Sequence, residues 1–435
     1  MICPKHSGNV RVPDGFSGAL LACESVRDGA VILHGPTGCR GLHGAMSDRF
    51  FPRLDAGKQL NYAERFYFSQ SRIPTTYLDG DDYVFGGREK LTQAIAMVVK
   101  HNAALVTVIN SPGAALIGDD LQRCATEAAP FTPCATIEMP MLSHPFAAGY
   151  QQGVISILEA LSLKPQPRIP RAVVLVGLSI AHQHWSGSIE ELRRLLGLCG
   201  IEVLCAVGAG SATDEYQKIP QAACYAVIHD EYANCVAPWL VHQYGGAAAT
   251  SISGAPVGFS ATIEWITAVA HATHADPTPA INDIRDRRRQ VSRMIDRASI
   301  YTEALKGTTF AVQSDPSFAL PLAQWLFQYL GMLPVSVETP DFYSTDAAAK
   351  LQSWLESIGC GDVWQKPWRL TDPEILFADG QELLQARFGN KCGGIEVAFP
   401  SGRVIDIVPK SMLGALGGAW LVENILREVR WVLWT

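Results

Sequence analysis

Residues 28–41 read Asp-Gly-Ala-Val-Ile-Leu-His-Gly-Pro-Thr-Gly-Cys-Arg-Gly. An apolar, β-branched run ends at His34, and a glycine-rich turn then carries Cys39. This order is typical of a strand that delivers a cysteine onto a tight turn. The backbone N–H groups of such a turn lower the pKa of a nearby thiol and can donate hydrogen bonds to the sulfides of a metal cluster. A buried structural cysteine explains this motif alone equally well.

The pattern of an apolar strand followed by a turn recurs along the chain. The run 104–110, Ala-Leu-Val-Thr-Val-Ile-Asn, ends in the turn Ser111-Pro-Gly and precedes a predicted helix from about Asp119. Strands that alternate with helices predict an α/β fold with parallel sheets flanked by helices. Ligands in such sheets gather at the carboxyl ends of the strands. Other predicted strands cover residues 172–176, 201–207, 226–229 and 308–312.

This alternation divides the chain into three predicted domains. We expect a first domain over residues 1–165, a second over 170–280 and a third over 306–435, with a connecting helix over 281–305. Alternating prolines in residues 164–170 cannot sustain a helix and indicate a linker. A length of 435 residues agrees with two or three domains, because a single core stops growing well before that size.

The composition excludes several classes of protein. Hydrophobic residues make up 48% of the chain and charged residues 18%, which favours a large buried core over disorder. The net charge of -7 argues against nucleic acid or an anionic membrane surface as a partner. Apolar runs fall short of the roughly 20 residues that span a bilayer, and no signal-peptide pattern is present. We therefore expect a cytoplasmic protein whose 11 cysteines are core residues or metal ligands rather than disulfides.

The sequence argues against nucleotide hydrolysis by this chain. Residues 207–211, Val-Gly-Ala-Gly-Ser, follow a predicted strand but lack the third glycine and the acidic partner of a dinucleotide-binding turn. An ordinary loop between strand and helix is therefore expected there. No glycine-rich loop ends in Gly-Lys-Ser/Thr, and the absence of a Cys-x-x-Cys pair disfavours ferredoxin-type and zinc-ribbon sites.

Further motifs occur in the order found in one protein family. In these motifs, and in residues 28–41, the chain resembles the nitrogenase component 1-like oxidoreductases. This family includes the nitrogenase subunits, dark-operative protochlorophyllide reductase and the nitrogenase cofactor scaffold. The resemblance spans nearly the whole chain. The motifs are Tyr83-Val-Phe-Gly-Gly-Arg-Glu-Lys-Leu91, Leu116-Ile-Gly-Asp-Asp120, Pro256-Val-Gly-Phe-Ser-Ala-Thr262, Asp372-Pro-Glu-Ile-Leu-Phe377 and Met412-Leu-Gly-Ala-Leu-Gly-Gly-Ala419.

The resemblance implies three Rossmann-like domains, an iron-sulfur cluster of [4Fe-4S] type near a subunit interface, and an Fe-protein-like ATPase that supplies electrons. It also implies a homodimer, or a heterodimer or heterotetramer with a homologous subunit. Gly35, Gly38 and Ser111 are then expected to contact the cluster. The leading hypothesis is a reductase component that passes electrons through the cluster to a small-molecule or tetrapyrrole-like substrate. A metallocluster scaffold and a non-catalytic structural subunit are the alternatives.

The expected cluster site departs from the family pattern at two positions. Where family members carry ligand cysteines, this chain has Asp14 and Ser111, so only Cys39 keeps a family ligand position. We hypothesise that two chains each supply Cys39 and Cys3 to one cluster, with Asp14 or Cys23 as substitutes. A core role is the favoured alternative for Cys23, because it lies in an apolar stretch.

Histidines are the candidate proton donors. His34, beside the cysteine turn, and His229, at the end of a predicted strand, are the expected catalytic groups. By the resemblance, His229 lies near the position of a cofactor thiolate, but no histidine follows His274, so dinitrogen reduction on an iron-molybdenum cofactor is not expected. A satisfied strand-end histidine is the alternative for His229. A solvent-facing polar loop is the favoured interpretation of His182 and His184.

Overall fold

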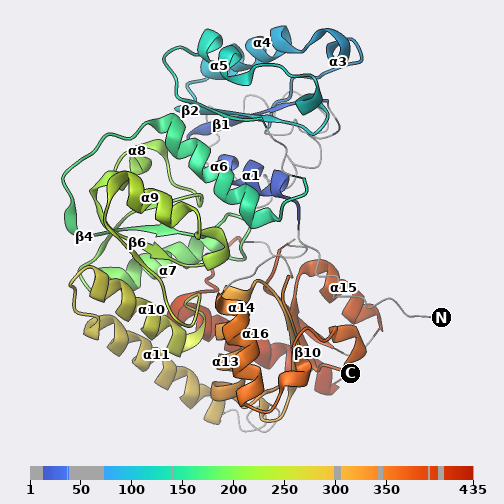
Figure 1. Cartoon of the computed structure of the whole chain (residues 1–435). Helices are drawn as coiled ribbons and strands as arrows, with labels where there is room; N and C mark the ends of the chain where they lie inside the picture. Colours follow the sequence, from blue (N-terminus) through green and yellow to red (C-terminus); the bar gives the residue numbers. More distant parts are fainter. Residues whose placement is uncertain are drawn as a thin grey trace.

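The computed structural model describes residues 13–36, 38, 73–138, 142–297, 305–340, 346–389, 392–399 and 406–434. These residues form three separate parallel β-sheets with helices packed on their faces (Figure 1). Within these ranges, every helix is too short or too polar to span a bilayer.

The first sheet has the strand order β1-β2-β3. Successive side chains of its strands point to opposite faces, so Ile32 and Val106 pack on α4 and α5, whereas Leu33 and Ile109 pack toward α1 and α6. Both faces of the sheet are therefore covered by helices. The bounds are β1 (Gly29–His34), β2 (Leu105–Asn110), β3 (Cys134–Ile137), α1 (Gly15–Glu24), α3 (Asp82–Phe85), α4 (Arg88–Val99), α5 (Leu121–Ala128) and α6 (Phe146–Leu161).

Helices α1 and α6 approach each other closely because glycines face their contact. A Cβ added to Gly149 would lie 1.7 Å from the carbonyl oxygen of Gly15, and one added to Gly18 would lie 2.0 Å from that of Phe146. The two helices share one core with the second sheet, through residues such as Val174. This helix pair therefore joins the first and second sheets.

The second sheet has the order β5-β4-β6-β7. The chain runs from β4 to β5 on one side and later returns to place β6 on the other, so the strand order reverses between β4 and β6. Such a reversal opens a crevice at the carboxyl ends of the two strands. The bounds are β4 (Ile169–Val176), β5 (Glu202–Ala206), β6 (Ala222–Val227), β7 (Ala247–Ala249), α7 (Trp185–Leu198), α8 (Thr213–Tyr216), α9 (Val236–Tyr244) and α10 (Gly258–Ala272).

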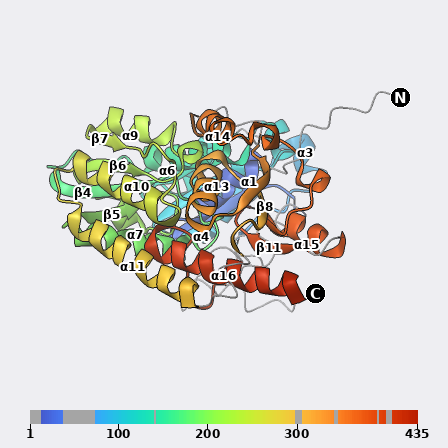
Figure 2. The same cartoon turned by 90° about the horizontal axis from the view of Figure 1, so that it is seen from below.

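The third sheet has the order β11-β10-β8-β9, with a reversal between β8 and β10. The last helix, α16, lies along α10 and α11 of the preceding part of the chain (Figure 2). The second and third sheets consequently share one continuous hydrophobic core. The bounds are α11 (Thr278–Arg297), β8 (Thr309–Gln313), α13 (Pro316–Leu330), β9 (Leu333–Glu338), α14 (Asp346–Ser357), β10 (Ile375–Ala378), α15 (Gly380–Gly389), β11 (Gly393–Glu396) and α16 (Gly414–Trp434).

The predicted α/β class with parallel sheets flanked by helices is confirmed. Each sheet lies within one of the three expected segments, except that β4 begins one residue early, at Ile169. The domain limits themselves stay predictions. The expected connecting helix overlaps α11, which begins at Thr278. The loop at residues 207–211 agrees with the expected ordinary turn, because the Tyr150 hydroxyl lies 2.2 Å from a Cβ added to Gly208 and fills the space beside it.

Candidate functional site

The carboxyl edge of the first sheet brings together Gly35 and Ser111, two of the expected cluster-contacting residues. Strands β1 and β2 pair with His34 opposite Asn110, and the backbone N–H of Ser111 donates to the carbonyl oxygen of His34 over 2.8 Å. A Cβ added to Gly35 would lie 2.3 Å from the Ser111 hydroxyl oxygen. The turn that leads toward Cys39 therefore starts directly against Ser111, although Cys39 itself lies outside the described residues.

His34 is fully buried at this edge, and both of its ring nitrogens have partners. Nδ1 lies 3.0 Å from the Thr76 hydroxyl, and Nε2 lies 3.1 Å from Oδ2 of Asp119. The same carboxylate oxygen accepts the backbone N–H of Gly87 over 2.8 Å. Burial lowers the pKa of His34, and the hydrogen bond to Asp119 opposes that shift. His34 thus holds the turn to two neighbouring segments, and the expectation that it is a catalytic group stays a prediction.

The other expected ligands divide into two groups. Cys3 lies outside the described residues, as Cys39 does. Asp14 is the N-cap of α1, where its carboxylate accepts the backbone N–H of Ser17 over 2.8 Å. Cys23 is 1% exposed in the core beside Thr107, and burial raises the pKa of its thiol. The placement of Cys23 favours the alternative of a core cysteine.

The implied iron-sulfur cluster requires thiolates that the described residues do not assemble. Among these residues, no group of three or more His, Cys, Asp or Glu side chains is arranged to hold a metal ion. Gly38 is exposed, and a Cβ added there would meet no atom of the described residues within 4 Å. The expected thiol ligands Cys39 and Cys3 both lie outside the described residues, so their part in a ligand set stays a prediction.

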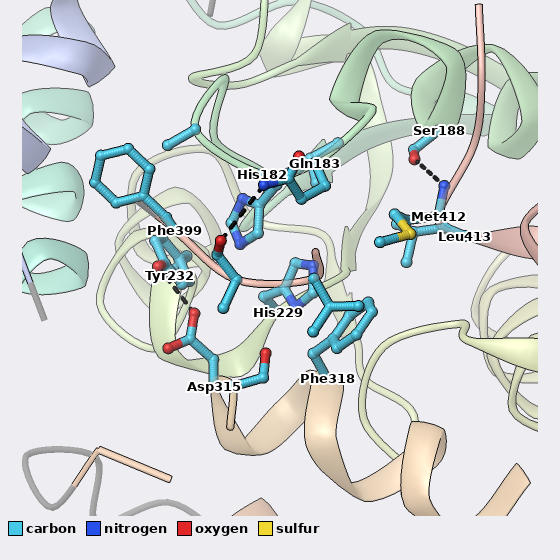
Figure 3. Close-up of a pocket in the computed structure, with 15 residues that line it drawn as sticks. His182, Gln183, Ser188, His229, Tyr232, Asp315, Phe318, Phe399, Met412 and Leu413 are labelled. Atoms are coloured by element: carbon cyan, nitrogen blue, oxygen red, sulfur yellow. Dashed lines mark hydrogen bonds between the residues drawn. The ribbon is translucent and has the colours of Figure 1, made fainter. Parts of the chain in front are cut away.

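A small cavity lies where the carboxyl ends of the second and third sheets face each other (Figure 3). It is lined from the second sheet by residues that follow β4 and β6, including His182 and His229, and from the third sheet by Asp315 and Phe318 after β8. Both strand-order reversals thus contribute to one cavity, which is where ligands bind in such folds. Its volume of about 30 Å³ holds one or two water molecules and excludes a tetrapyrrole macrocycle.

The rings of His182 and His229 are stacked in this cavity, 4.4 Å apart and 4° from parallel. Nδ1 of His229 lies 3.0 Å from the Ser317 hydroxyl. Burial lowers the pKa of His182 to about 4, and burial together with His182 holds the pKa of His229 well below its ordinary value. Both rings are therefore neutral near pH 7. Stacked rings carry their nitrogen lone pairs in parallel planes, so the pair cannot chelate one metal ion in this arrangement.

The interpretation of His182 and His184 as a solvent-facing loop is wrong. His184 is 3% exposed, and its Nδ1 contacts Oδ1 of Asp406 over 2.5 Å. Nε2 of His182 is buried and has no hydrogen-bond partner among the described residues. The loop folds inward because it follows β4 at the point of strand-order reversal, where the third sheet covers it. Its position after a strand was the available signal for a site.

Two carboxyl groups beside the cavity were not anticipated from the sequence. Asp315 accepts the Tyr232 hydroxyl over 3.0 Å, and Glu231 accepts the backbone N–H of Ser317 over 2.6 Å. Burial raises the pKa of both carboxyl groups, and the Asp315 carboxylate raises that of Glu231 further. Glu231 follows β6 and Asp315 follows β8, so their common feature in the sequence is a polar residue just after a buried strand.

Comparisons with known proteins match most of this chain to one family. Residues 15–427 match the family model described as "Nitrogenase component 1 type Oxidoreductase". A nitrogenase molybdenum-iron protein beta chain from Methanococcus maripaludis is 24% identical over 358 residues, or 74% of this chain and 71% of that protein. A subunit of light-independent protochlorophyllide reductase from a Synechococcus species is 24% identical over 363 residues, which cover 78% of this chain and 63% of that protein.

Two further similarities extend the comparison. The nitrogenase iron-molybdenum cofactor biosynthesis protein NifE from a Nostoc species is 28% identical over 236 residues, which cover 53% of this chain and 45% of NifE. The solved structure "Nitrogenase Cp1 at pH 6.5" superposes with a TM-score of 0.76 at 15% identity and covers 99% of this chain and 94% of its own. At that identity the superposition shows a shared fold.

Proposed function

Since this chain belongs to the family of nitrogenase component 1 type oxidoreductases, we propose that it is the cluster-carrying component of a nitrogenase-like reductase. In this proposal an Fe-protein-like ATPase supplies single electrons, and the component works in the cytoplasm. An iron-sulfur cluster, [4Fe-4S] by our hypothesis, is held at the edge of the first sheet by Cys39 and Cys3 of two chains. The substrate is a small molecule that binds in the cavity beside His229.

One observation carries the cluster assignment. The turn toward Cys39 and the residue in the second family ligand position, Ser111, meet at the carboxyl edge of β1 and β2, where an added Cβ on Gly35 would lie 2.3 Å from Ser111. That convergence supports a ligand role for the turn that carries Cys39. The cluster would supply the electron transfer, and the chain would supply backbone N–H groups, exclusion of water and placement of the turn.

The metal content of the purified protein tests this assignment. We expect the full chain, purified without oxygen, to be brown and to contain iron and acid-labile sulfide. Cys39→Ala should lose at least about nine-tenths of both, because thiolates are the preferred cluster ligands. Cys235→Ala provides a matched control, since Cys235 is an exposed cysteine at the start of α9 and is not an expected ligand. Equal iron in wild type and Cys39→Ala would refute the ligand assignment.

A cluster-assembly scaffold is the second candidate function, and the similarity to NifE favours it. A scaffold shares the fold and the cluster, but its product is a metal cluster delivered to another protein. Transfer of iron to an apo acceptor protein without substrate turnover would identify this role. A colourless, iron-free dimer would instead identify a structural subunit whose homologous partner carries the site.

A further inference from the structure

We propose that the cavity between the second and third sheets binds a small uncharged molecule, whose hydrogen-bond-accepting atom pairs with the Nε2–H group of His182. This inference deepens the proposed function and rests on it, because it names the class of molecule that the substrate cavity accepts. It assigns a donor role to His182, which the sequence did not single out as catalytic.

The backbone determines which nitrogen of His182 carries the proton. The N–H group of Ser179 donates to Nδ1 of His182 over 2.9 Å, whereas the Ser179 carbonyl oxygen lies 3.3 Å away. Nδ1 therefore presents its lone pair. The ring is neutral near pH 7, because burial lowers its pKa to about 4. A neutral imidazole has one proton, so that proton lies on Nε2.

The resulting Nε2–H group is a donor without an acceptor. Nε2 is buried and has no hydrogen-bond partner among the described residues. Buried polar groups in folded proteins are almost always paired, so an unpaired donor at a cavity indicates a missing ligand or water. Stacking on His229 holds the His182 ring, and Ser317 holds His229 in turn. The donor is therefore oriented before a ligand arrives.

The walls of the cavity select against charge. Most side chains around the histidines are apolar, among them Leu178, Phe318 and Phe399. No Lys or Arg occurs among the described residues that line the cavity. Asp315 lines it, and an anion would have to enter beside that carboxylate without a counter-charge. Among the described residues that line the cavity, the buried side-chain atom without a partner is the Nε2 donor of His182, which favours an accepting ligand over a cation.

Size completes the description of the ligand. The volume of about 30 Å³ holds one or two water molecules, so the ligand has at most about three heavy atoms. Formamide has that size and carries an accepting carbonyl, and formate is an anion of the same shape. A ligand this small binds in the millimolar range at best. Comparing formamide with formate therefore separates the effect of the ligand's charge from the effect of its shape.

The test is a titration of the full chain labelled with ¹⁵N-histidine and followed by NMR. The His182 resonances are assigned by their absence in His182→Phe. We expect the free protein to show the Nε2–H tautomer at His182, and formamide to shift that signal with saturation in the millimolar range. Formate should bind at least about tenfold more weakly. His184, which is buried but lies outside the cavity, should keep its signal and serves as the internal control.

Two variants guard against a merely structural effect. His182→Phe should abolish the saturable shift at His229, whereas His182→Gln, whose Nε2 can donate from a similar place, should keep it within about fivefold. The inference is overturned if His182 carries its proton on Nδ1, if neither probe shifts His182, or if formate binds as well as formamide. Because no turnover is measured, formamide binding by an iron-free protein would leave this inference standing while the proposed reductase function fails.

Discussion

Two histidines that follow buried strands, the fully buried His34 and the half-buried His182, differ in one respect that separates structural support from ligand binding. Both nitrogens of His34 are paired, with Thr76 and Asp119. Only Nδ1 of His182 is paired, with Ser179, and its Nε2 has no partner among the described residues. The first histidine ties the cysteine turn to its neighbours, and the second offers a donor to a cavity.

The comparison extends to the surroundings of each histidine. At the edge of the first sheet, Gly35 lies so close to Ser111 that no side chain fits between these two residues. The edges of the second and third sheets leave about 30 Å³ between them. We infer that the first edge positions a turn and the second admits a small molecule. Substitutions at the two places should therefore have effects of very different size.

The largest effect on stability is expected for His34→Ala. The change opens a cavity and leaves Thr76 and Asp119 without their shared partner, so we expect a loss of about 3 kcal/mol in the free energy of unfolding, measured with urea. His144→Ala is the control, because His144 is exposed and its removal should cost less than about 0.5 kcal/mol. If His34→Ala lowered the free energy of unfolding by less than about 1 kcal/mol, His34 would not be the structural histidine that the comparison with His182 requires.

The next effect is expected for Gly35→Ala. Its added Cβ would lie 2.3 Å from the Ser111 hydroxyl oxygen and 2.6 Å from the Ser111 Cβ, which should cost about 2 kcal/mol of stability. Gly38→Ala is the matched control in the same turn, because its Cβ meets no atom within 4 Å in the part of the chain that the structure describes. Adding Ser111→Gly to Gly35→Ala should restore most of the loss in a double-mutant cycle. Additive costs would show that the two residues do not touch.

A smaller, pH-dependent effect is expected for Glu231→Gln. The folded-state pKa of Glu231 is raised by burial and by Asp315, so folding keeps a proton that the unfolded chain releases. The wild type should therefore lose stability as the pH rises from about 5 to 8. Glu231→Gln should be more stable than the wild type at pH 8, by on the order of 1 kcal/mol, and similar to it at pH 5. The free energy of unfolding of each protein is measured with urea at several pH values. A difference between wild type and Glu231→Gln that is the same at pH 5 and pH 8 would contradict the assignment.

The smallest effect is expected for His182→Phe. Its phenyl ring keeps the stacking on His229 and removes the unpaired donor, which offsets the lost acceptor for the N–H of Ser179. The free energy of unfolding should change by about 1 kcal/mol or less. A loss as large as that of His34→Ala would mean that both histidines are structural.

The sequence predicted the fold class because apolar runs that end in turns are a local pattern. It also placed Gly35 and Ser111 at one site, through the resemblance to the family. It did not predict that the His182 loop is buried, because that burial depends on the third sheet, more than a hundred residues away in the chain. Glu231 and Asp315 were missed for the same reason. Glu231 follows β6 of the second sheet and Asp315 follows β8 of the third sheet. The two residues come together only because the carboxyl ends of these two sheets face each other.

ATP-dependent reduction of the iron-sulfur absorbance tests the central claim most directly. The anaerobically purified chain, oxidised beforehand, is mixed with an Fe-protein-type ATPase, a reductant and MgATP, and the visible absorbance is followed with time. We predict bleaching that requires both the ATPase and ATP hydrolysis, and that is lost in Cys39→Ala. Absorbance that persists with ATP and the ATPase present, or that fades equally fast without them, would contradict the account.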